Sequence, residues 1–174
     1  MAISLASLRR TTGVKPQRIM LYGVHGVGKT SLAAAAPAPV FLQTEEGEGT
    51  MELATFGLLR DYESVMQAIG SLYDEAHDYR TVVLDTLDWM EPLIWAEACR
   101  RGNWSTIEDA GYGKGYLAAA DVWRELLGGL NALRDERAMT VLMTAHCEIK
   151  RFEAPDIDPY DRYQPKLHAR ASAL

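Results

Sequence analysis

The residues with the clearest chemical meaning lie at 23–30, where Gly-Val-His-Gly-Val-Gly-Lys-Thr fits the pattern G-x-x-x-x-G-K-[ST]. Glycines here let successive backbone N–H groups point inward around phosphate oxygens, in conformations that a side chain obstructs. Lys29 would then reach the β- and γ-phosphates of a nucleotide, and the Thr30 hydroxyl would ligate Mg²⁺. We therefore predict a nucleotide-binding loop with contacts from Gly23, His25, Gly26, Val27, Gly28, Lys29, Thr30 and Ser31.

Acidic residues follow two of the apolar runs in the chain. Asp85 ends a β-branched run, and in a protein with a phosphate loop that position holds the water shell of Mg²⁺. The next residue is Thr86, so this chain has no glutamate directly after the aspartate. Glu45 and Glu46 follow the run 40–43, where a carboxylate can orient a water toward the γ-phosphate. We expect Glu45 ahead of Glu46 in this role, and a solvated acidic turn is the alternative.

A histidine follows the last of the apolar runs. His146 comes directly after 140–145, and in an α/β fold with a phosphate loop we expect that strand to lie beside the phosphate-loop strand. A polar side chain there can contact the γ-phosphate and respond when that phosphate is released. The alternative is a histidine at the edge of the sheet whose hydrogen bonds are all made within the protein. The candidate catalytic residues are Lys29, Glu45 and His146, and the candidate metal ligands are Thr30 and Asp85.

The elements that must position these residues alternate between short apolar runs and longer amphipathic stretches. Strands are predicted at 18–22, 40–43, 81–85 and 140–145, and helices at 29–36, 61–77, 87–101 and 117–134. The proline-containing segment after Lys150 is expected to be loop. Strands separated by helices form right-handed βαβ units. We therefore predict an α/β fold, a three-layer sandwich with a mainly parallel sheet that binds ligands at the carboxyl ends of its strands.

Length and composition support one globular domain. The 174 residues are 48% hydrophobic and 24% charged, which excludes collagen-like and disordered chains. The net charge of −6 does not by itself suggest a nucleic-acid binder, but it is unevenly distributed, with +4 in residues 1–20 and +3 in residues 162–174. The two cysteines have no metal-ligand spacing, and no apolar run reaches the ~18–20 residues of a membrane span. These features predict a reduced, cytoplasmic chain.

Several segments together carry a family resemblance, namely 23–30, 41–45, 82–86, 112–116, 141–146 and 160–168. They resemble the RecA-like P-loop ATPases, specifically the phage-encoded nucleotide-binding proteins of the single-strand-annealing and recombination type. The resemblance implies an ATPase that uses ATP and Mg²⁺ and binds single-stranded DNA in a bacterial host's cytoplasm. It also implies assembly into a ring or filament, with ATP near subunit boundaries and a single-strand-binding protein as a further candidate partner. It places the catalytic glutamate on Glu45 and the coupling of γ-phosphate to DNA on His146, where RecA itself has glutamine.

The resemblance raises the expectation that two mixed segments face DNA, because they combine bases, aromatic rings and glycines. The candidate DNA-binding residues are Arg101, Tyr112 and Lys114 in the first segment and Arg151, Tyr160, Arg162 and Tyr163 in the second. Acidic residues in both segments leave a purely structural role open. The expected domains are a basic arm at 1–15 and a RecA-like ATPase domain at 16–174, shortened at its C-terminus relative to cores with a further strand.

Two other functions remain open at this point. One is a nucleotide-binding assembly or packaging accessory with little turnover, and the other is a small-molecule P-loop kinase. A kinase needs an arginine-rich lid, and no segment of the chain is dense in arginine. A GTPase is disfavoured because the chain has no Asn-Lys-x-Asp motif to read guanine.

Overall fold

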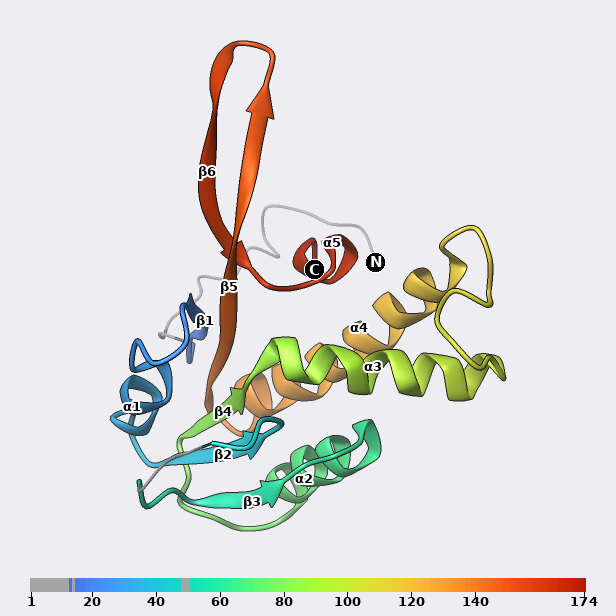
Figure 1. Cartoon of the computed structure of the whole chain (residues 1–174). Helices are drawn as coiled ribbons and strands as arrows, with labels where there is room; N and C mark the ends of the chain where they lie inside the picture. The colour runs from blue at the N-terminus through green and yellow to red at the C-terminus, as the bar shows by residue number, and fades with distance from the viewer. Residues whose placement is uncertain (1–12, 14, 48–50) are drawn as a thin grey trace, which may run out of the picture.

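A computed structural model describes residues 13, 15–47 and 51–174, so the expected arm at 1–15 lies almost wholly outside the described residues. The strands are β1 (Arg18–Gly23), β2 (Pro39–Gln43), β3 (Thr55–Leu58), β4 (Thr81–Asp85), β5 (Thr140–Ala154) and β6 (Ile157–Pro165). The helices are α1 (Lys29–Ala34), α2 (Tyr62–Asp74), α3 (Leu87–Gly102), α4 (Lys114–Glu136) and α5 (Ala169–Ser172) (Figure 1). Each strand and helix predicted from the sequence is present; β5 and α4 extend further than predicted, whereas α1 and α2 are shorter.

The sheet places the ends of its central strands side by side. Its order is β1-β5-β4-β2-β3 with parallel pairing throughout, and β6 pairs antiparallel with the outer part of β5. Gly23 lies opposite His146, and Gln43 lies opposite Asp85. The predicted α/β fold with a mainly parallel sheet is therefore confirmed, as is the position of the His146 strand beside the phosphate-loop strand.

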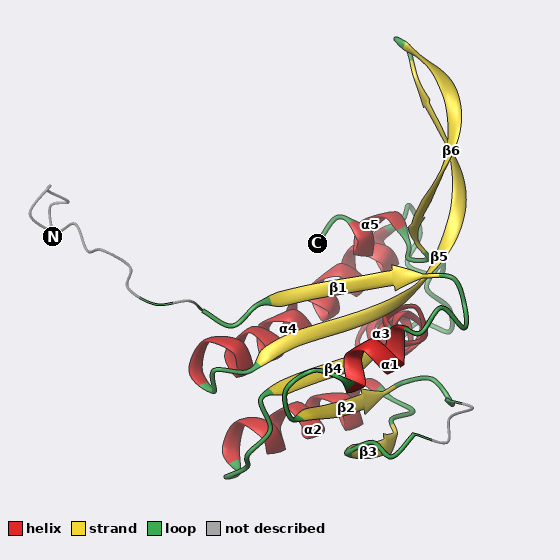
Figure 2. Cartoon of the chain, turned by 90° about the vertical axis from the view of Figure 1, so that its left-hand side faces the viewer, coloured by secondary structure: helices red, strands yellow, loops and turns green. Residues whose placement is uncertain are grey.

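The two faces of the sheet are covered unequally. Helices α2, α3 and α4 pack on one face, where Val82, Leu84 and Val141 belong to the larger hydrophobic core. On the other face Phe41, Val83 and Leu142 pack with Ala33 of α1 in a small second core (Figure 2). The strand residues alternate between the two cores because successive side chains point to opposite faces.

Helical periodicity explains how the larger core forms. In α2 the buried residues Val65, Ala68, Ile69 and Leu72 follow the spacing of one helix face. The helix begins where the Asp61 side chain accepts a hydrogen bond from the Ser64 N–H at 2.7 Å. No helix in the described ranges is long and apolar enough to cross a membrane.

The segment after Lys150 was predicted to be loop, and this prediction is wrong. Strand β5 continues to Ala154 and turns into β6, so the two form a long hairpin that projects from the sheet (Figures 1 and 2). The prolines of this segment favour loop, but proline is tolerated in an edge strand such as β6. Strand β3 was missed as well, since Thr55–Leu58 is short and contains a glycine.

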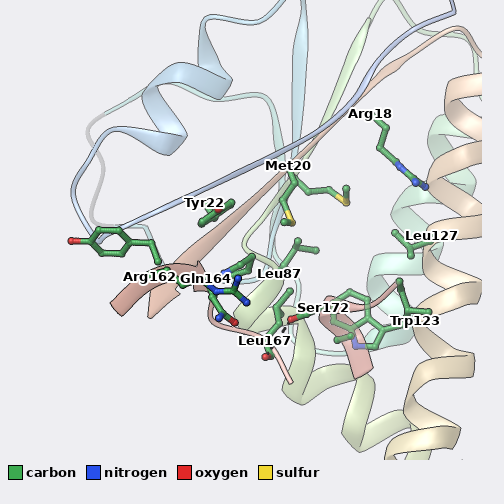
Figure 3. Close-up of a pocket in the computed structure, with 15 residues that line it drawn as sticks. Arg18, Met20, Tyr22, Leu87, Trp123, Leu127, Arg162, Gln164, Leu167 and Ser172 are labelled. Carbon is green, nitrogen blue, oxygen red and sulfur yellow. Dashed lines mark hydrogen bonds between the residues drawn. The ribbon is translucent and has the colours of Figure 1, made fainter. Parts of the chain in front are cut away.

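A groove runs along the exposed side of β1. In the part of the chain that the structure describes, β1 has β5 as its only strand neighbour. Its Met20 and Tyr22 are 41% and 47% exposed. They face a cavity of about 680 Å³ whose other walls come from α4, from the end of β6 and from the segment after it, including Trp123, Leu127, Arg162, Gln164 and Leu167, with Leu87 of α3 and Met143 of β5 (Figure 3). We call this cavity the β1 groove.

Candidate functional site

The phosphate loop leaves β1 at the carboxyl edge of the sheet and enters α1. Gly26 and Gly28 have φ angles of 73° and 94°, which glycine adopts without strain. No atom lies within 4 Å of where a Cβ would sit at either residue, so the backbone conformation and not crowding requires glycine. Lys29 begins α1, and its Nζ donates to the carbonyl oxygens of Gly23 and Val24 at 3.1 Å each. The loop therefore holds its lysine close to its own backbone.

Asp85 at the end of β4 is a buried carboxylate with two hydroxyl donors. It is 8% exposed, and Thr30 Oγ1 donates to its Oδ2 at 2.9 Å. The buried hydroxyl of Thr144 on β5 donates to Oδ1. The two predicted metal ligands, Thr30 and Asp85, are thus in direct contact although 55 positions separate them in the chain. Their oxygens are of the kind that Mg²⁺ takes from proteins.

Strands β2 and β4 are held together at their carboxyl ends by Thr44. Its N–H donates to the carbonyl of Asp85 at 2.8 Å, and its hydroxyl donates to the carbonyl of Thr86 at 2.7 Å. The same hydroxyl accepts from the N–H of Thr86 at 3.0 Å. Because Thr44 is buried and fully engaged, the residue that follows it has a defined position at the edge of the sheet.

The two glutamates after β2 have different surroundings. Glu45 Oε2 accepts from the Thr86 hydroxyl at 3.5 Å and lies 3.9 Å from His146 Nδ1. Glu46 instead forms an exposed ion pair with Arg60 at 3.0 Å. Glu45 is therefore the glutamate that lies near Thr86, which follows β4, and His146 of β5.

His146 is oriented by a carboxylate of α3. Asp88 Oδ1 accepts from the His146 backbone N–H at 2.8 Å, and its Oδ2 lies 2.9 Å from the ring Nδ1. Burial pushes the pKa of Asp88 up, but the hydrogen bonds from His146 outweigh it, and the pKa lies below its ordinary value. Asp88 is therefore an ionised acceptor, and Nδ1 carries the ring proton toward it.

These residues surround one cavity of about 710 Å³ at the carboxyl edge of the sheet. Its lining includes His25, Gly26, Gly28, Lys29, Thr30, Ser31, Glu45, Glu46, Asp85 and His146. Gly23 and Val27, also predicted to contact nucleotide, do not line the cavity, since Gly23 ends β1 and Val27 is 62% exposed. We call this cavity the phosphate pocket.

Three polar residues of the site were missed from the sequence: Thr44, Thr144 and Asp88. Thr44 and Thr144 lie in or beside apolar strands, where a threonine is ordinary and gives no local signal. Asp88 lies three positions after Asp85, in the first turn of α3, where an acidic residue is also common. Only the pairing of β4 with both β2 and β5 reveals what these side chains contact.

A comparison with protein-family models places this site in a known group, because a model described as an AAA domain matches residues 15–174. The chain belongs to this AAA domain family. The family indicates a P-loop protein that binds nucleotide and has ATPase chemistry. A comparison with curated proteins finds no match.

The described residues of this AAA domain fit ATP with Mg²⁺. Two glycines with positive φ, a lysine at the start of α1 and the paired oxygens of Thr30 and Asp85 are the groups that such a ligand needs. The cavity is also large enough, since small-molecule sites are of roughly 300–1,000 Å³.

The candidate DNA-binding residues of this AAA domain lie in two separate places (Figure 1). Arg101 is at the end of α3, where Glu97 and Glu125 accept its hydrogen bonds at 2.6–2.8 Å. Tyr112 is fully exposed, and Lys114 begins α4 nearby. The others lie on the hairpin, where Tyr160 and Tyr163 are 47% and 59% exposed. The structure therefore does not bring the two sets together.

Proposed function

We propose that this AAA domain protein is a Mg²⁺-dependent ATPase that acts with single-stranded DNA in phage recombination or annealing, in the cytoplasm of a bacterial host. One observation carries the proposal. Strand β5 reaches the phosphate pocket at His146 and continues without a break into the projecting hairpin. A change at the γ-phosphate thus has a direct covalent route to an exposed surface.

Five residues of the phosphate pocket have distinct roles in this proposal, namely Lys29, Thr30, Glu45, Asp85 and His146. Bound Mg²⁺ would supply charge neutralisation for the transferred phosphoryl group. Lys29 neutralises the β- and γ-phosphates, while Thr30 and Asp85 hold the metal and its water. Glu45, positioned beside Thr86, orients the attacking water and accepts its proton. His146, held by Asp88, contacts the γ-phosphate through the nitrogen that Asp88 leaves free.

One face of the hairpin combines aromatic rings with basic side chains, and this combination supports a role in binding single-stranded DNA. Opposite residues of antiparallel strands share a face, and Lys150 pairs with Arg162 while Phe152 pairs with Tyr160. The guanidinium of Arg162 lies 4.3 Å from the Phe152 ring centroid, and the two aromatic rings are 5.4 Å apart. Stacking rings next to cations are the groups that bind single strands. We call this surface, Lys150, Phe152, Tyr160 and Arg162, the aromatic face.

The opposite face of the hairpin is less suited to DNA. Arg151 lies there opposite Asp161, and its guanidinium is 3.4 Å from Glu153 and 3.9 Å from Asp161. The aromatic face has its own acidic neighbour, since Lys150 pairs with Glu148 at 2.6 Å, but Arg162 has no carboxylate partner among the described residues. We therefore assign DNA contact to the aromatic face first.

Assembly into a ring or filament is part of the same proposal. Val27 of the phosphate loop and Leu32 of α1 are apolar side chains that are 62% and 60% exposed. They lie beside the nucleotide site on the sheet face that α1 covers. A second copy placed against them would bring ATP close to a subunit boundary.

The test is ATP turnover at low salt, with and without single-stranded DNA, using Lys29→Ala as the blank. We expect turnover above the blank and a several-fold rise with DNA. A Phe152→Ala, Arg162→Ala double variant should weaken DNA binding about tenfold or more in fluorescence anisotropy, because each stacked base contributes about 1–3 kcal/mol. Arg151→Ala, on the opposite face, is the matched control and should change the affinity little.

The outcomes separate the parts of the proposal. Turnover without any DNA binding would overturn the recombination role and leave an ATPase. Nucleotide binding without turnover would favour an assembly or packaging accessory, and phosphate transfer to a small acceptor would favour a kinase.

A further inference from the structure

Three side chains from separate elements meet at the mouth of the phosphate pocket. His25 comes from the phosphate loop, Glu45 follows β2, and His146 ends the pairing of β5 with β1. One ligand atom from each lies within 4.8 Å of the others. The two imidazole rings are stacked with their centroids 5.7 Å apart. The ATPase role uses Glu45 and His146, but it gives His25 no role beyond the predicted nucleotide contact and does not explain why the two rings stack.

The second coordination shell of a metal ligand is already built around His146. Asp88 accepts hydrogen bonds from both its backbone N–H and its ring Nδ1, which fixes the ring and leaves Nε2 with a free lone pair. Metal-binding histidines in proteins characteristically donate their other nitrogen to a carboxylate, and this contact orients the ring and raises its basicity. The Asp88 side chain is 7% exposed, so this contact is a buried feature of the fold.

The donor set selects a class of metal. Two imidazoles and one carboxylate suit Zn²⁺, Co²⁺ or Ni²⁺, whereas Mg²⁺ prefers oxygen ligands only. Tetrahedral Zn²⁺ at about 2.0–2.1 Å from each donor requires donor atoms about 3.3 Å apart. The three groups are further apart than this, with ligand atoms within 4.8 Å of one another and Glu45 Oε2 3.9 Å from His146 Nδ1, so Glu45 and His25 must turn toward Nε2 to bind a metal. His25 is exposed on a loop next to Gly26, where its side chain has room to rotate.

We infer that His25, Glu45 and His146 form a second divalent-cation site, separate from the Thr30–Asp85 position, that takes Zn²⁺ or a metal of the same ligand preference. A water or a phosphate oxygen completes its coordination. A metal held there uses the Glu45 carboxylate, so the occupied site also inhibits hydrolysis. This second consequence rests on the proposed function, whereas metal binding itself does not.

The test for binding uses Co²⁺ as the probe with the full chain, without nucleotide and in excess Mg²⁺. We expect one equivalent of Co²⁺ with the visible absorption of a four- or five-coordinate site, displaced by Zn²⁺. His25→Ala and His146→Ala should each weaken binding about tenfold or more, and Asp88→Asn about tenfold. His168→Ala removes a histidine outside the phosphate pocket and is the matched control. No binding, or binding insensitive to both His25→Ala and His146→Ala, would overturn the inference.

Cys147 needs a control of its own because it follows His146 directly and is partly exposed. Cys147→Ser should leave Co²⁺ binding unchanged, since the inferred ligands include no thiolate. A thiolate charge-transfer band that disappears in Cys147→Ser would show a different ligand set and overturn the assignment.

The test for inhibition compares turnover with and without Zn²⁺ at saturating Mg²⁺·ATP, as a ratio within each variant. We expect at least a tenfold loss in the natural chain and a ratio near one in His25→Ala. Co²⁺ binding in a chain without turnover would uphold the site and overturn the proposed ATPase. Turnover without Co²⁺ binding would do the reverse.

Discussion

Two cavities of nearly equal volume, about 710 Å³ for the phosphate pocket and about 680 Å³ for the β1 groove, are both lined in part by β5, through His146 and Met143 respectively. The phosphate pocket is lined by charged and hydroxyl side chains whose positions are set by hydrogen bonds between neighbouring strands. The β1 groove is lined mainly by Met20, Tyr22, Trp123, Leu127 and other apolar side chains (Figure 3). Volume alone therefore says little about which cavity does chemistry.

The two cavities differ in whether the buried polar groups around them are hydrogen-bonded. Asp85 of the phosphate pocket and the neighbouring Thr44 and Thr144 are buried and hydrogen-bonded, as buried polar groups normally are. In the groove wall the buried Trp123 Nε1 has no hydrogen-bond partner among the described residues. We expect substitutions in the pocket to change turnover, and substitutions around the groove to change stability.

The largest effect expected is on turnover. Glu45→Gln should lower ATP turnover about 10²–10⁴-fold, because the amide cannot accept the proton of the attacking water. The melting temperature and ATP affinity should stay close to those of the natural chain. Phosphate release and a nucleotide-binding titration measure the two quantities. Glu46→Gln, whose carboxylate pairs with Arg60, is the matched control and should retain most of the turnover. Equal turnover in the two variants would remove Glu45 from the mechanism.

The next largest effect is on the free energy of unfolding, and it compares the core with the groove at two neighbouring positions of α4. Leu126 of α4 is fully buried, and Leu126→Ala should cost about 2–5 kcal/mol in the free energy of unfolding. The neighbouring Leu127 lines the groove and is only half-buried, so Leu127→Ala should cost about 1 kcal/mol. Urea unfolding of the two variants measures the difference. Similar costs would mean that the groove is packed as tightly as the core.

The smallest effect concerns the segment that closes the groove. Both carboxylate oxygens of Glu91 accept from the His168 N–H, at 3.0 and 3.1 Å. Burial raises the pKa of Glu91; the His168 hydrogen bond opposes this, and the charges of Asp88 and Glu148 add to it. A raised native pKa favours the protonated form, so the contribution of Glu91 to stability is complete below its ordinary value of 4.5 and is lost as pH rises through the native pKa.

Glu91→Gln should remove this pH dependence because the amide is neutral throughout. Relative to the natural chain, the variant should gain on the order of 1 kcal/mol or less between acidic and mildly alkaline pH. Thermal melts of both proteins across that range provide the measurement. A variant that loses stability on the alkaline side would contradict the assignment of a costly buried charge.

Local sequence correctly predicts the elements that one segment can form without a partner strand. The helix at 61–77 was predicted from its periodicity, and it forms between Tyr62 and Asp74. The hairpin could not be predicted from local sequence, because β6 forms only through its pairing with β5 and its prolines are typical of loops.

What the sequence determined by itself is the phosphate loop, the carboxylate at the end of β4, and the alternation of strands and helices that orders them. These depend on backbone conformations and periodicities that neighbouring residues impose. Only the tertiary structure decided that Glu45 rather than Glu46 contacts His146, that Asp88 orients His146, and that His25 joins them. Those contacts link residues far apart in the chain, and they exist because the sheet order places β5 between β1 and β4.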